Sequence, residues 1–461
     1  MMYSHDDTIA AIATPAGAGG IGIVKISGPL SEEIVGKLFR TRRETLQLES
    51  HYLYYGHIID PSTKGIVDEV LLSFMHKPDT YTREDIAEIN CHGGYFVLQK
   101  ILSLVLSCGA RLAGPGEFTK RAFLNGRLDL TQAEAVIDVI SARSSQSLNI
   151  AAGQVSGSLR DSMMALHDSL VDVLSFVEAA IDFPEEDIEI LSGEHLVQRL
   201  EDTVIKPAEE LIKSHEDGRV YREGASVAIT GNPNVGKSSI LNRLLDAERA
   251  IVTDIPGTTR DVIEETLNIH GISVRIVDTA GIREARDRIE EIGIKLTRES
   301  IERADLLLFV IDGSAPLRDE DRSIYHEIRH KPVIAVLNKM DLGLKVSPEQ
   351  ITGSFSAKEA VAVSALEGTN IENLRKAIFS ALVGDIGDVD GKIVPNARHY
   401  AVLSRLLAMI RQAVENLARE ASPEVVAIDI REALECLDEI TGRTTPDDIL
   451  DRIFSRFCIG K

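Results

Sequence analysis

The spacing of apolar positions changes along the chain, and each change marks a boundary between regions. In residues 1–120, short apolar runs such as residues 21–26 and 70–74 lie between turn-forming clusters, a pattern typical of β-strands. Residues 95–106 have helical spacing instead. We therefore predict a compact α/β domain over residues 1–120.

From residue 121 onward, apolar side chains recur at steps of three and four, which indicates amphipathic helices. Thr131 and Glu134 precede an apolar run and predict a capping box at the start of one helix. A second helix is expected over residues 159–177, ending before Pro184. Residues 121–220 are thus predicted to form the first part of a helical domain.

Between residues 221 and 382, apolar runs typical of buried strands alternate with helical or polar segments. The runs are residues 227–230, 274–277, 306–311 and 333–337. This alternation predicts a doubly wound parallel sheet with α/β architecture. Residues 384–390 are expected to be a linker. Helical spacing then returns within residues 383–461, at residues 400–417, 425–437 and 449–457.

The composition is that of a folded protein with about two to four domains. Of 461 residues, 44% are hydrophobic, and the formal net charge of −22 argues against non-specific coating of nucleic acid or acidic membranes, so any nucleic-acid contact is expected to be local. The four cysteines form no CxxC pair, which argues against a zinc ribbon or disulfide framework and favours the cytoplasm. No apolar run approaches the ~18 residues that a membrane span requires, so we expect no membrane partner.

Residues 231–238, Gly-Asn-Pro-Asn-Val-Gly-Lys-Ser, match the phosphate-loop motif G-x-x-x-x-G-K-[ST]. In this motif, backbone N–H groups and the N-terminus of the following helix hold the phosphates of a nucleotide. Lys237 is expected to neutralise the β- and γ-phosphates, and the hydroxyl of Ser238 is expected to bind Mg²⁺. Because a predicted strand precedes the motif and a predicted helix follows it, a chance glycine loop is a poor alternative.

Three further segments narrow the ligand to a guanine nucleotide. Asp278 begins Asp-Thr-Ala-Gly at a strand end, so its carboxylate is expected beside the metal and the N–H of Gly281 near the γ-phosphate. Residues 338–341, Asn-Lys-Met-Asp, offer a carboxylate to the N1 and N2 donors of guanine, which adenine lacks. Residues 364–366, Ser-Ala-Leu, offer an N–H to guanine O6. Together they predict a GTPase, whereas a P-loop ATPase or kinase would show little preference for GTP.

Residues 251–261, between the phosphate loop and Asp278, are typical of a loop that becomes ordered when GTP binds. Thr259 is the candidate to bind Mg²⁺ and the γ-phosphate, with a surface turn as the alternative. Many small GTPases place a glutamine after Asp-x-x-Gly to orient the attacking water, but Ile282 stands here. The acids that follow are candidates for that role or ordinary surface charges; they are Glu284, Asp287, Glu290 and Glu291.

The combination of these motifs resembles the MnmE (TrmE) family of tRNA modification GTPases. The most specific segments are Asp-Ile-Pro-Gly-Thr-Thr-Arg-Asp at residues 254–261, Asp-Thr-Ala-Gly-Ile-Arg-Glu at 278–284 and Phe-Cys-Ile-Gly-Lys at 457–461. The resemblance runs the full length of the chain. It implies an N-terminal tetrahydrofolate-binding and dimerisation domain, a discontinuous α-helical domain and an inserted Ras-like GTPase domain, called the G domain.

The resemblance also implies K⁺-dependent GTP hydrolysis through pairing of two G domains across a homodimer, with K⁺ in the role of an arginine finger. Asn234, Thr253, Ile255 and Thr258 match the family's K⁺ ligands, and Glu290 matches its water-orienting carboxylate. The positions that match nucleotide contacts are Asn234, Val235, Gly236, Lys237, Ser238, Ser239, Thr253, Asp254, Ile255, Pro256, Gly257, Thr258, Thr259, Asp278, Thr279, Ala280, Gly281, Asn338, Lys339, Asp341, Ser364, Ala365 and Leu366.

Lys25, Glu88, Arg127 and Lys461 match the family's contacts to tetrahydrofolate. The family often has arginine at the position of Lys25, and lysine keeps the charge but loses the planar fork. Without the resemblance, each of these residues would be interpreted as an exposed charge. Cys458 is expected near the folate, where it either participates in the reaction or is a buried, inert thiol.

The function implied is that of a homodimeric cytoplasmic enzyme that joins an FAD-dependent partner protein in a heterotetramer. Together they would add an aminomethyl or carboxymethylaminomethyl group to C5 of the wobble uridine, position 34, of certain tRNAs. 5,10-Methylene-tetrahydrofolate would supply the carbon, and 5-formyl-tetrahydrofolate is a suitable analogue. The alternative, a regulatory GTPase switch in ribosome assembly, leaves residues 1–120 and Cys458 without a role.

Overall fold

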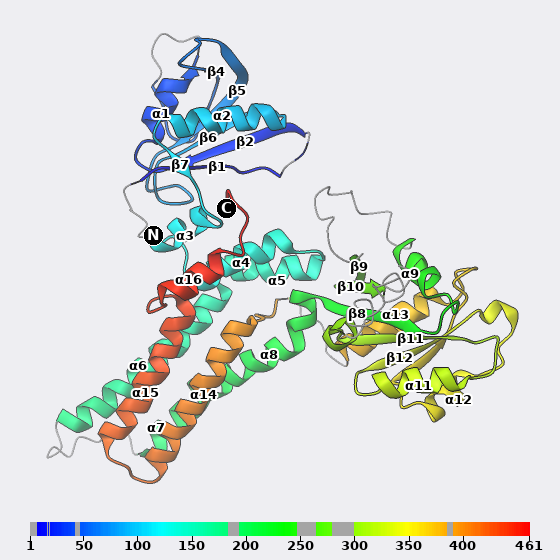
Figure 1. Ribbon diagram of the computed structural model, residues 1–461. Helices are drawn as coiled ribbons and strands as arrows, with labels where there is room; N and C mark the ends of the chain where they lie inside the picture. The colour runs from blue at the N-terminus through cyan, green and yellow to red at the C-terminus, as the bar shows by residue number, and fades with distance from the viewer. Residues whose placement is uncertain are drawn as a thin grey trace. The chain divides into compact units, whose positions relative to one another are not determined.

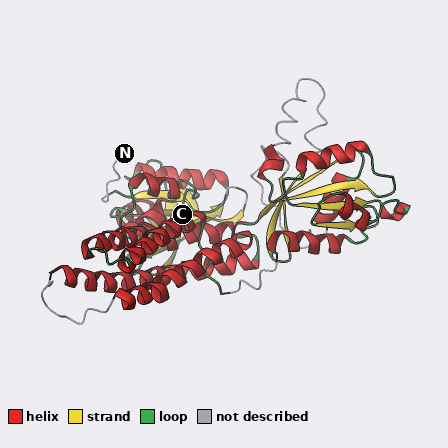
Figure 2. Ribbon diagram, turned by 90° about the horizontal axis from the view of Figure 1, so that it is seen from below, coloured by secondary structure: helices red, strands yellow, loops and turns green. Residues whose placement is uncertain are grey.

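The computed structural model describes residues 7–15, 17, 19–41, 47–182, 193–246, 264–278, 299–384 and 391–461 (Figure 1). The chain forms two compact units. The first comprises Met1–Ile137, Gln154–Val204 and Arg405–Lys461, and the second comprises Asp138–Gly153 and Ile205–Ser404. Each unit contains one β-sheet and several helices (Figure 2). Both units include part of the region expected to be the helical domain.

The first unit contains a seven-stranded sheet in the order β3-β4-β5-β6-β2-β1-β7. The strands are β1 (Ile9–Ile12), β2 (Gly19–Ser27), β3 (Phe39–Arg40), β4 (Tyr52–Ile59), β5 (Ile66–Met75), β6 (Ile86–Gly93) and β7 (Arg111–Leu112). Neighbours are antiparallel except β1 and β7, which are parallel. The strands predicted at residues 21–26 and 70–74 are therefore confirmed.

Helices α1 (Ser31–Leu38) and α2 (Tyr95–Ser107) cover one face of this sheet (Figure 1). Leu72 and Phe74 of β5 are buried in the core with apolar residues of both helices. Leu71, between them in the sequence, points to the opposite face because successive strand side chains alternate, and it is exposed. The helix predicted over residues 95–106 is thus confirmed as α2.

The remaining helices of the first unit are α3 (Glu117–Leu124), α6 (Ser158–Asp182), α7 (Gly193–Leu200), α15 (Pro423–Thr441) and α16 (Asp447–Phe454), with parts of α4 (Leu130–Ser141), α5 (Ser145–Val155) and α14 (Ala397–Ala418). Helices α6 and α15 lie side by side (Figure 1). The helices predicted over residues 159–177, 400–417 and 425–437 are confirmed. The one predicted over residues 449–457 ends earlier, at Phe454.

The capping box predicted at Thr131 and Glu134 is wrong by two residues. Helix α4 begins at Leu130, and the carboxylate of Asp129 accepts the backbone N–H of Gln132 at 2.8 Å. The side chain of Gln132 in turn accepts the N–H of Asp129 at 3.2 Å, which completes an Asp-x-x-Gln box. Thr131 and Glu134 are instead buried inside the helix.

The second unit contains a six-stranded sheet in the order β13-β12-β11-β8-β10-β9. The strands are β8 (Ala225–Gly231), β9 (Glu264–Ile269), β10 (Ile272–Asp278), β11 (Leu306–Asp312), β12 (Val333–Asn338) and β13 (Glu359–Ala362). All neighbours are parallel except β9 and β10. The predicted parallel sheet is confirmed in its centre, but its β9 edge is antiparallel because a short turn at Gly271 joins the two strands.

Helices cover both faces of this sheet, as a doubly wound fold requires. They are α8 (Lys206–Glu223), α9 (Lys237–Asp246), α11 (Asp319–Ile328), α12 (Pro348–Ser354) and α13 (Ile371–Val383). The core on one face joins Ile229 of β8 to α9 and α13, and the core on the other joins Ala228 of β8 to α11 and α12. Among the described residues, no helix is both long and apolar enough to cross a membrane.

Candidate functional site

The phosphate-loop motif lies between strand β8 and helix α9, in the context that the sequence predicts. Its backbone is left-handed at Asn234, with φ of 64°, and at Gly236, with φ of 97°. A Cβ atom on Gly236 would lie 2.2 Å from Nδ2 of Asn338, so this position admits only glycine. The conformation of the loop is therefore set by these residues.

Lys237 lies across the start of this loop. Its Nζ donates hydrogen bonds to the carbonyl oxygens of Gly231, at 3.0 Å, and Asn232, at 2.8 Å. Asn232 is held in turn by Asp321, whose Oδ1 accepts from Nδ2 at 2.6 Å. The ammonium group can exchange its carbonyl partners for phosphate oxygens, which bind a cation more strongly than neutral carbonyls do.

Asn338 connects three of the predicted segments. Its Nδ2 donates to the carbonyl of Val235 at 2.8 Å, and its Oδ1 accepts the N–H of Ala365 at 3.0 Å. Asn338 is only 3% exposed, so leaving either group unpaired would be costly. Nearby, Oδ1 of Asp341 accepts a hydrogen bond from the hydroxyl of Ser364 at 2.6 Å. The structure thus brings residues of the phosphate loop, 338–341 and 364–366 together.

Two cationic side chains support these loops. Nζ of Lys339 is 2.7 Å from Oδ2 of Asp312. Burial would raise the pKa of Asp312, but the hydrogen bond from Lys339 contributes to holding that pKa below its usual value. Arg243 of α9 donates from Nε to the carbonyl of Ala365 at 2.7 Å and also bonds the carbonyl of Leu366.

Much of the predicted nucleotide site lies outside the described residues. The positions concerned are Thr253, Asp254, Ile255, Pro256, Gly257, Thr258, Thr259, Thr279, Ala280, Gly281, Ile282, Glu284, Asp287, Glu290 and Glu291. The backbone of Asp278 ends β10, opposite Ile229 of β8. Ser238 and Ser239 lie in the first turn of α9. Of the predicted K⁺ ligands, Asn234 is the one within the described residues.

The four residues predicted to contact folate converge in the first unit. Lys25 on β2 and Glu88 on β6 lie opposite each other in the sheet, with Nζ 3.7 Å from Oε1. Burial lowers the pKa of Lys25, Glu88 opposes this effect, and the charges of Lys461 and Arg127 add to it. The other three side chains therefore lie within electrostatic reach of Lys25.

Residues 458–461 pack against the segment that leads into α3. The N–H of Gly116 donates to the carbonyl of Cys458 at 3.3 Å, and the N–H of Phe118 donates to that of Lys461 at 3.2 Å. Cys458 is exposed, so the alternative of a buried thiol is wrong. Its chemical role stays a prediction.

Tyr81 is a residue of this cluster that the sequence did not single out. Its ring centroid is 4.9 Å from Nζ of Lys25 and 4.7 Å from Cζ of Arg127. Its hydroxyl is 2.9 Å from Oγ1 of Thr119 on α3. Tyr81 lies in a turn-rich segment, where no periodicity distinguishes it, so the sequence carried no signal for this position.

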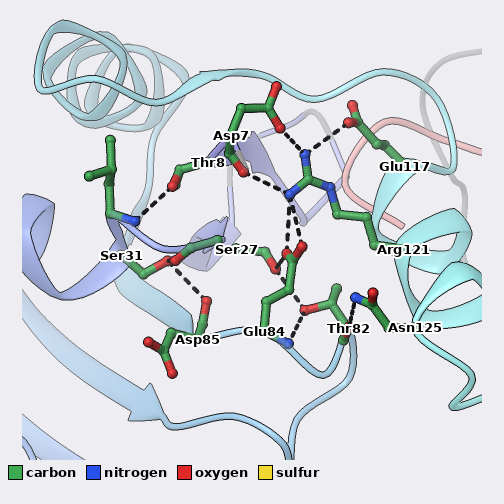
Figure 3. Close-up of polar contacts among 12 residues, drawn as sticks. Asp7, Thr8, Ser27, Ser31, Thr82, Glu84, Asp85, Glu117, Arg121 and Asn125 are labelled. Carbon is green, nitrogen blue, oxygen red and sulfur yellow. Dashed lines mark hydrogen bonds and ion pairs between the residues drawn. The ribbon is translucent and has the colours of Figure 1, made fainter. Parts of the chain in front are cut away.

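Arg121 is at the centre of a neighbouring ion-pair network (Figure 3). Its Nη1 donates to the backbone carbonyl of Asp7 at 2.9 Å and to Oε1 of Glu84 at 3.1 Å. Arg111 pairs with Oδ2 of Asp7 at 2.6 Å and with Oε1 of Glu117 at 2.5 Å. Burial would raise the pKa of both Asp7 and Glu117, but the arginines hold both pKa values below their usual range. The network ties the segment before β1, the 80–85 turn, β7 and α3 together.

Two protein-family descriptions match consecutive parts of the chain. Residues 8–127 match the family described as GTP-binding protein TrmE N-terminus, and residues 130–458 match the MnmE helical domain. A tRNA modification GTPase MnmE of Natranaerobius thermophilus is 46% identical over 457 residues, which cover 99% of this chain and 100% of that protein. The one of Syntrophus aciditrophicus is 48% identical over 456 residues, 99% of each chain.

Solved structures match part of the chain. Era of Aquifex aeolicus, bound to GDP and aluminium fluoride, is 33% identical and covers 40% of this chain and 66% of its own, with a TM-score of 0.28. The G domain of the FeoB iron transporter of T. maritima is 25% identical and covers 34% of this chain and 98% of its own, with a TM-score of 0.27.

Proposed function

The chain belongs to the MnmE family of tRNA modification GTPases, and from this membership we propose that it modifies the wobble uridine, position 34, of certain tRNAs. With an FAD-dependent partner protein, it adds an aminomethyl or carboxymethylaminomethyl group to C5 of that base. 5,10-Methylene-tetrahydrofolate supplies the carbon. The working form is a cytoplasmic homodimer within a heterotetramer, and K⁺-activated GTP hydrolysis drives its conformational cycle.

The observation that carries this proposal is that one chain holds two differently built candidate sites. One is the phosphate loop with its guanine-reading segments in the second unit. The other is the cationic and aromatic cluster around Lys25 in the first unit. A GTPase that served only as a switch in ribosome assembly would use the first site and leave the second without a ligand.

In this proposal Asp341 selects guanine. The hydroxyl of Ser364 holds one carboxylate oxygen at 2.6 Å and so orients the group toward the N1 and N2 donors of the base. Replacing the carboxylate by an amide, Asp341→Asn, should weaken the preference for GTP over ATP. Competition binding of the two nucleotides to wild type and variant measures this, and an unchanged preference contradicts the assignment.

The oxygen donors predicted at the phosphate loop are of the type that hard cations prefer. Ser238 with Thr259 would hold Mg²⁺, which neutralises charge on the β- and γ-phosphates, and Asn234 would contribute an amide oxygen to K⁺. Within the described residues, no group of three or more His, Cys, Asp or Glu side chains is arranged to hold a metal. Phosphate oxygens and the segment around Thr259 would therefore supply the other ligands.

The chain's own side chains have separate tasks in hydrolysis. Lys237 would exchange its bonds to the Gly231 and Asn232 carbonyls for bonds to the phosphates and so hold them in place. Glu290 would accept a hydrogen bond from the attacking water and orient it toward the γ-phosphate. Cys458, exposed beside the folate cluster, is the candidate participant in the modification reaction.

An exposed apolar face supports dimerisation through the first unit. Leu53 and Tyr55 of β4 are 65% and 49% exposed and, two residues apart, point to one face of the sheet. Leu71 of β5 lies directly opposite Tyr55 and is 45% exposed. Because α1 and α2 cover the other face, this patch is free to pack against a second copy.

Potassium dependence is tested by comparing GTP hydrolysis in K⁺ and Na⁺ at equal ionic strength. The proposal expects much faster turnover in K⁺, since Na⁺ is too small for the same set of oxygen ligands. Equal rates in the two salts refute K⁺ activation while leaving the tRNA role intact.

The biological role is tested by deleting the gene and analysing the nucleosides of total tRNA by mass spectrometry. We expect the modified wobble uridine to disappear while ribosome profiles stay normal. Retention of the modified uridine together with defective ribosomal subunits would support the ribosome-assembly alternative instead.

A further inference from the structure

Tyr81 lies among the charged residues of the candidate folate site. Both Lys25 and Arg127 are placed over its ring, with distances to the centroid of 4.9 Å and 4.7 Å. The face of an aromatic ring attracts cations because its quadrupole puts negative potential above the ring plane. The ring of Tyr81 therefore attracts two cationic side chains, and this attraction opposes the repulsion between Lys25 and Arg127.

Positive charge exceeds negative charge around this ring. Lys25 pairs with Glu88, but within the part of the chain that the structure describes neither Arg127 nor Lys461 has an ion-pair partner. The side chain of Lys25 is only 15% exposed, so its charge is largely removed from water. Three cations beside one carboxylate in a partly buried cluster favour a ligand that brings negative charge.

The ring is also fixed in place before any ligand binds. The hydroxyl of Tyr81 lies 2.9 Å from Oγ1 of Thr119. The next residue, Thr82, is held by Ser27 at 2.7 Å between hydroxyls and by Asn125, whose Nδ2 donates to the Thr82 carbonyl at 2.6 Å (Figure 3). A ring held this way loses little conformational entropy when a flat molecule packs on it.

We propose that Tyr81 is the stacking residue of the folate site. The flat pyrimidinone part of the reduced pterin packs on the face of Tyr81 that Arg127 covers. Arg127 then leaves that face of the ring, and together with Lys461 it balances the negative charge that the ligand brings. The inference rests on the proposed function because it takes a reduced folate as the ligand, and it adds a specificity-determining residue to that site.

The test is calorimetric titration of the full-length protein with 5-formyl-tetrahydrofolate. Tyr81→Leu removes the ring and should weaken binding on the order of 10-fold or more, as loss of an aromatic stacking partner does. Tyr81→Phe keeps the ring and loses only the bond to Thr119, so affinity should fall by about threefold. Tyr95→Leu is the matched control, since Tyr95 is 62% exposed on α2, and should bind like wild type.

A second measurement does not depend on the Leu variant folding. The wild-type protein is labelled with 3-fluorotyrosine, and the fluorine resonance of Tyr81 is assigned by its absence from Tyr81→Phe. A stacked ligand should shift this resonance, while the resonance of Tyr95 should not move. An unmoved Tyr81 resonance under saturating ligand overturns the proposal.

The outcomes separate this inference from the proposed function. If wild type fails to bind 5-formyl-tetrahydrofolate, the folate part of the proposed function fails and this inference fails with it. If wild type binds and Tyr81→Leu binds equally well, only the role of Tyr81 is refuted. If Tyr81→Phe loses as much affinity as Tyr81→Leu, the hydroxyl and not the ring is the contact, and stacking is refuted.

Discussion

Gly236 is a residue of the phosphate loop that leaves little room for a side chain. Its φ is 97°, and a Cβ atom would lie 2.2 Å from Nδ2 of Asn338. Gly236→Ala should weaken GTP binding by on the order of 10-fold or more, because backbone strain and the clash together cost roughly 1–3 kcal/mol or more. Fluorescent GTP titration measures the affinity.

The control for this substitution is Gly353→Ala in α12. A Cβ atom there meets nothing within 4 Å, so GTP affinity should be unchanged. Equal affinity of Gly236→Ala and wild type would show that the loop can shift away from Asn338 at little cost.

The pKa of His92 depends on its contact with Asp68. Its Nδ1 is 2.7 Å from Oδ1 of Asp68, and this hydrogen bond raises the pKa of His92 above its usual value. The interaction therefore stabilises the folded protein below about pH 6.5, the pKa of an unfolded histidine, and is lost as the pH rises through the higher folded pKa. The substitution Asp68→Asn removes this partner and should return the pKa of His92 toward its usual value. An NMR titration of the variant measures this pKa, and an unchanged pKa would contradict the pairing.

Individual residues were predictable from the sequence where a motif fixes their spacing. The phosphate loop, including Lys237 and Ser238, could be assigned because its chemistry depends on neighbours in sequence. Tyr81 could not be assigned, because its importance comes from Lys25 and Arg127, which only folding brings to its ring.

Helix α4 depends on a cap that differs from the predicted one. Because the carboxylate of Asp129 accepts the N–H of Gln132, Asp129→Ala should destabilise the first turn of α4 by about 1 kcal/mol. Hydrogen exchange at the first-turn amides of α4 should accelerate accordingly. Glu432→Ala, an exposed change in the middle of α15, should leave those amides unaffected. No acceleration in Asp129→Ala would mean that tertiary packing alone holds the turn.

The docking of residues 458–461 depends on Gly460. Its φ is 97°, and a Cβ atom would lie 2.6 Å from the carbonyl oxygen of Ile12. Gly460→Ala should release the segment, so the amides of Gly116 and Phe118, which donate to it, should exchange faster with solvent.

The matched control for this release is Gly36→Ala in α1, where a Cβ atom meets nothing within 4 Å. It should leave the exchange of both amides as in wild type. Unchanged exchange in Gly460→Ala as well would show that the segment stays docked despite the substitution.

Elements with strong periodicity were predictable, whereas their ends and partners were not. Helix α6 follows directly from apolar steps of three and four. The cap of α4 was misplaced because Thr-x-x-Glu and Asp-x-x-Gln overlap in one stretch, and both satisfy the same capping rule. The antiparallel pairing of β9 with β10 was not predictable, because an apolar run indicates a strand but not the direction of its neighbour.

At the scale of the whole molecule, stability should fall in acid. Burial would raise the pKa of Asp7 and Glu117, yet their arginine partners hold both pKa values below the usual range of about 3.9–4.3. These carboxylates therefore stabilise the folded state above about pH 4, and their contribution is lost as the pH falls through the lower folded pKa values.

The variant Glu117→Gln tests this expectation. Its melting temperature should lie below that of wild type at pH 7, and the difference should shrink as the pH falls below about 4 and wild type progressively loses the same charge. Thermal melts across this range measure both. A difference that stays constant with pH would mean that packing, and not charge, makes Glu117 important.

The doubly wound fold of the G domain and the α/β fold of residues 1–120 were predictable because each follows from patterns along a continuous stretch. The proposed limits of the four domains, 1–120, 121–220, 221–382 and 383–461, remain predictions. The compact units divide within α4, α5 and α14, where one continuous helix contributes to both units and no change of spacing marks the place.

The contact between residues 458–461 and the segment around Gly116 has a consequence for the order in which the two candidate sites are completed during synthesis. During synthesis the G domain is complete long before Lys461 leaves the ribosome, so a nascent chain acquires its nucleotide pocket first. The cluster around Lys25 also needs residues 458–461, which lie after the G domain in the sequence and contact Gly116 and Phe118. A product truncated before residue 458 would therefore keep the phosphate loop while lacking the residues that pack against Gly116 and Phe118.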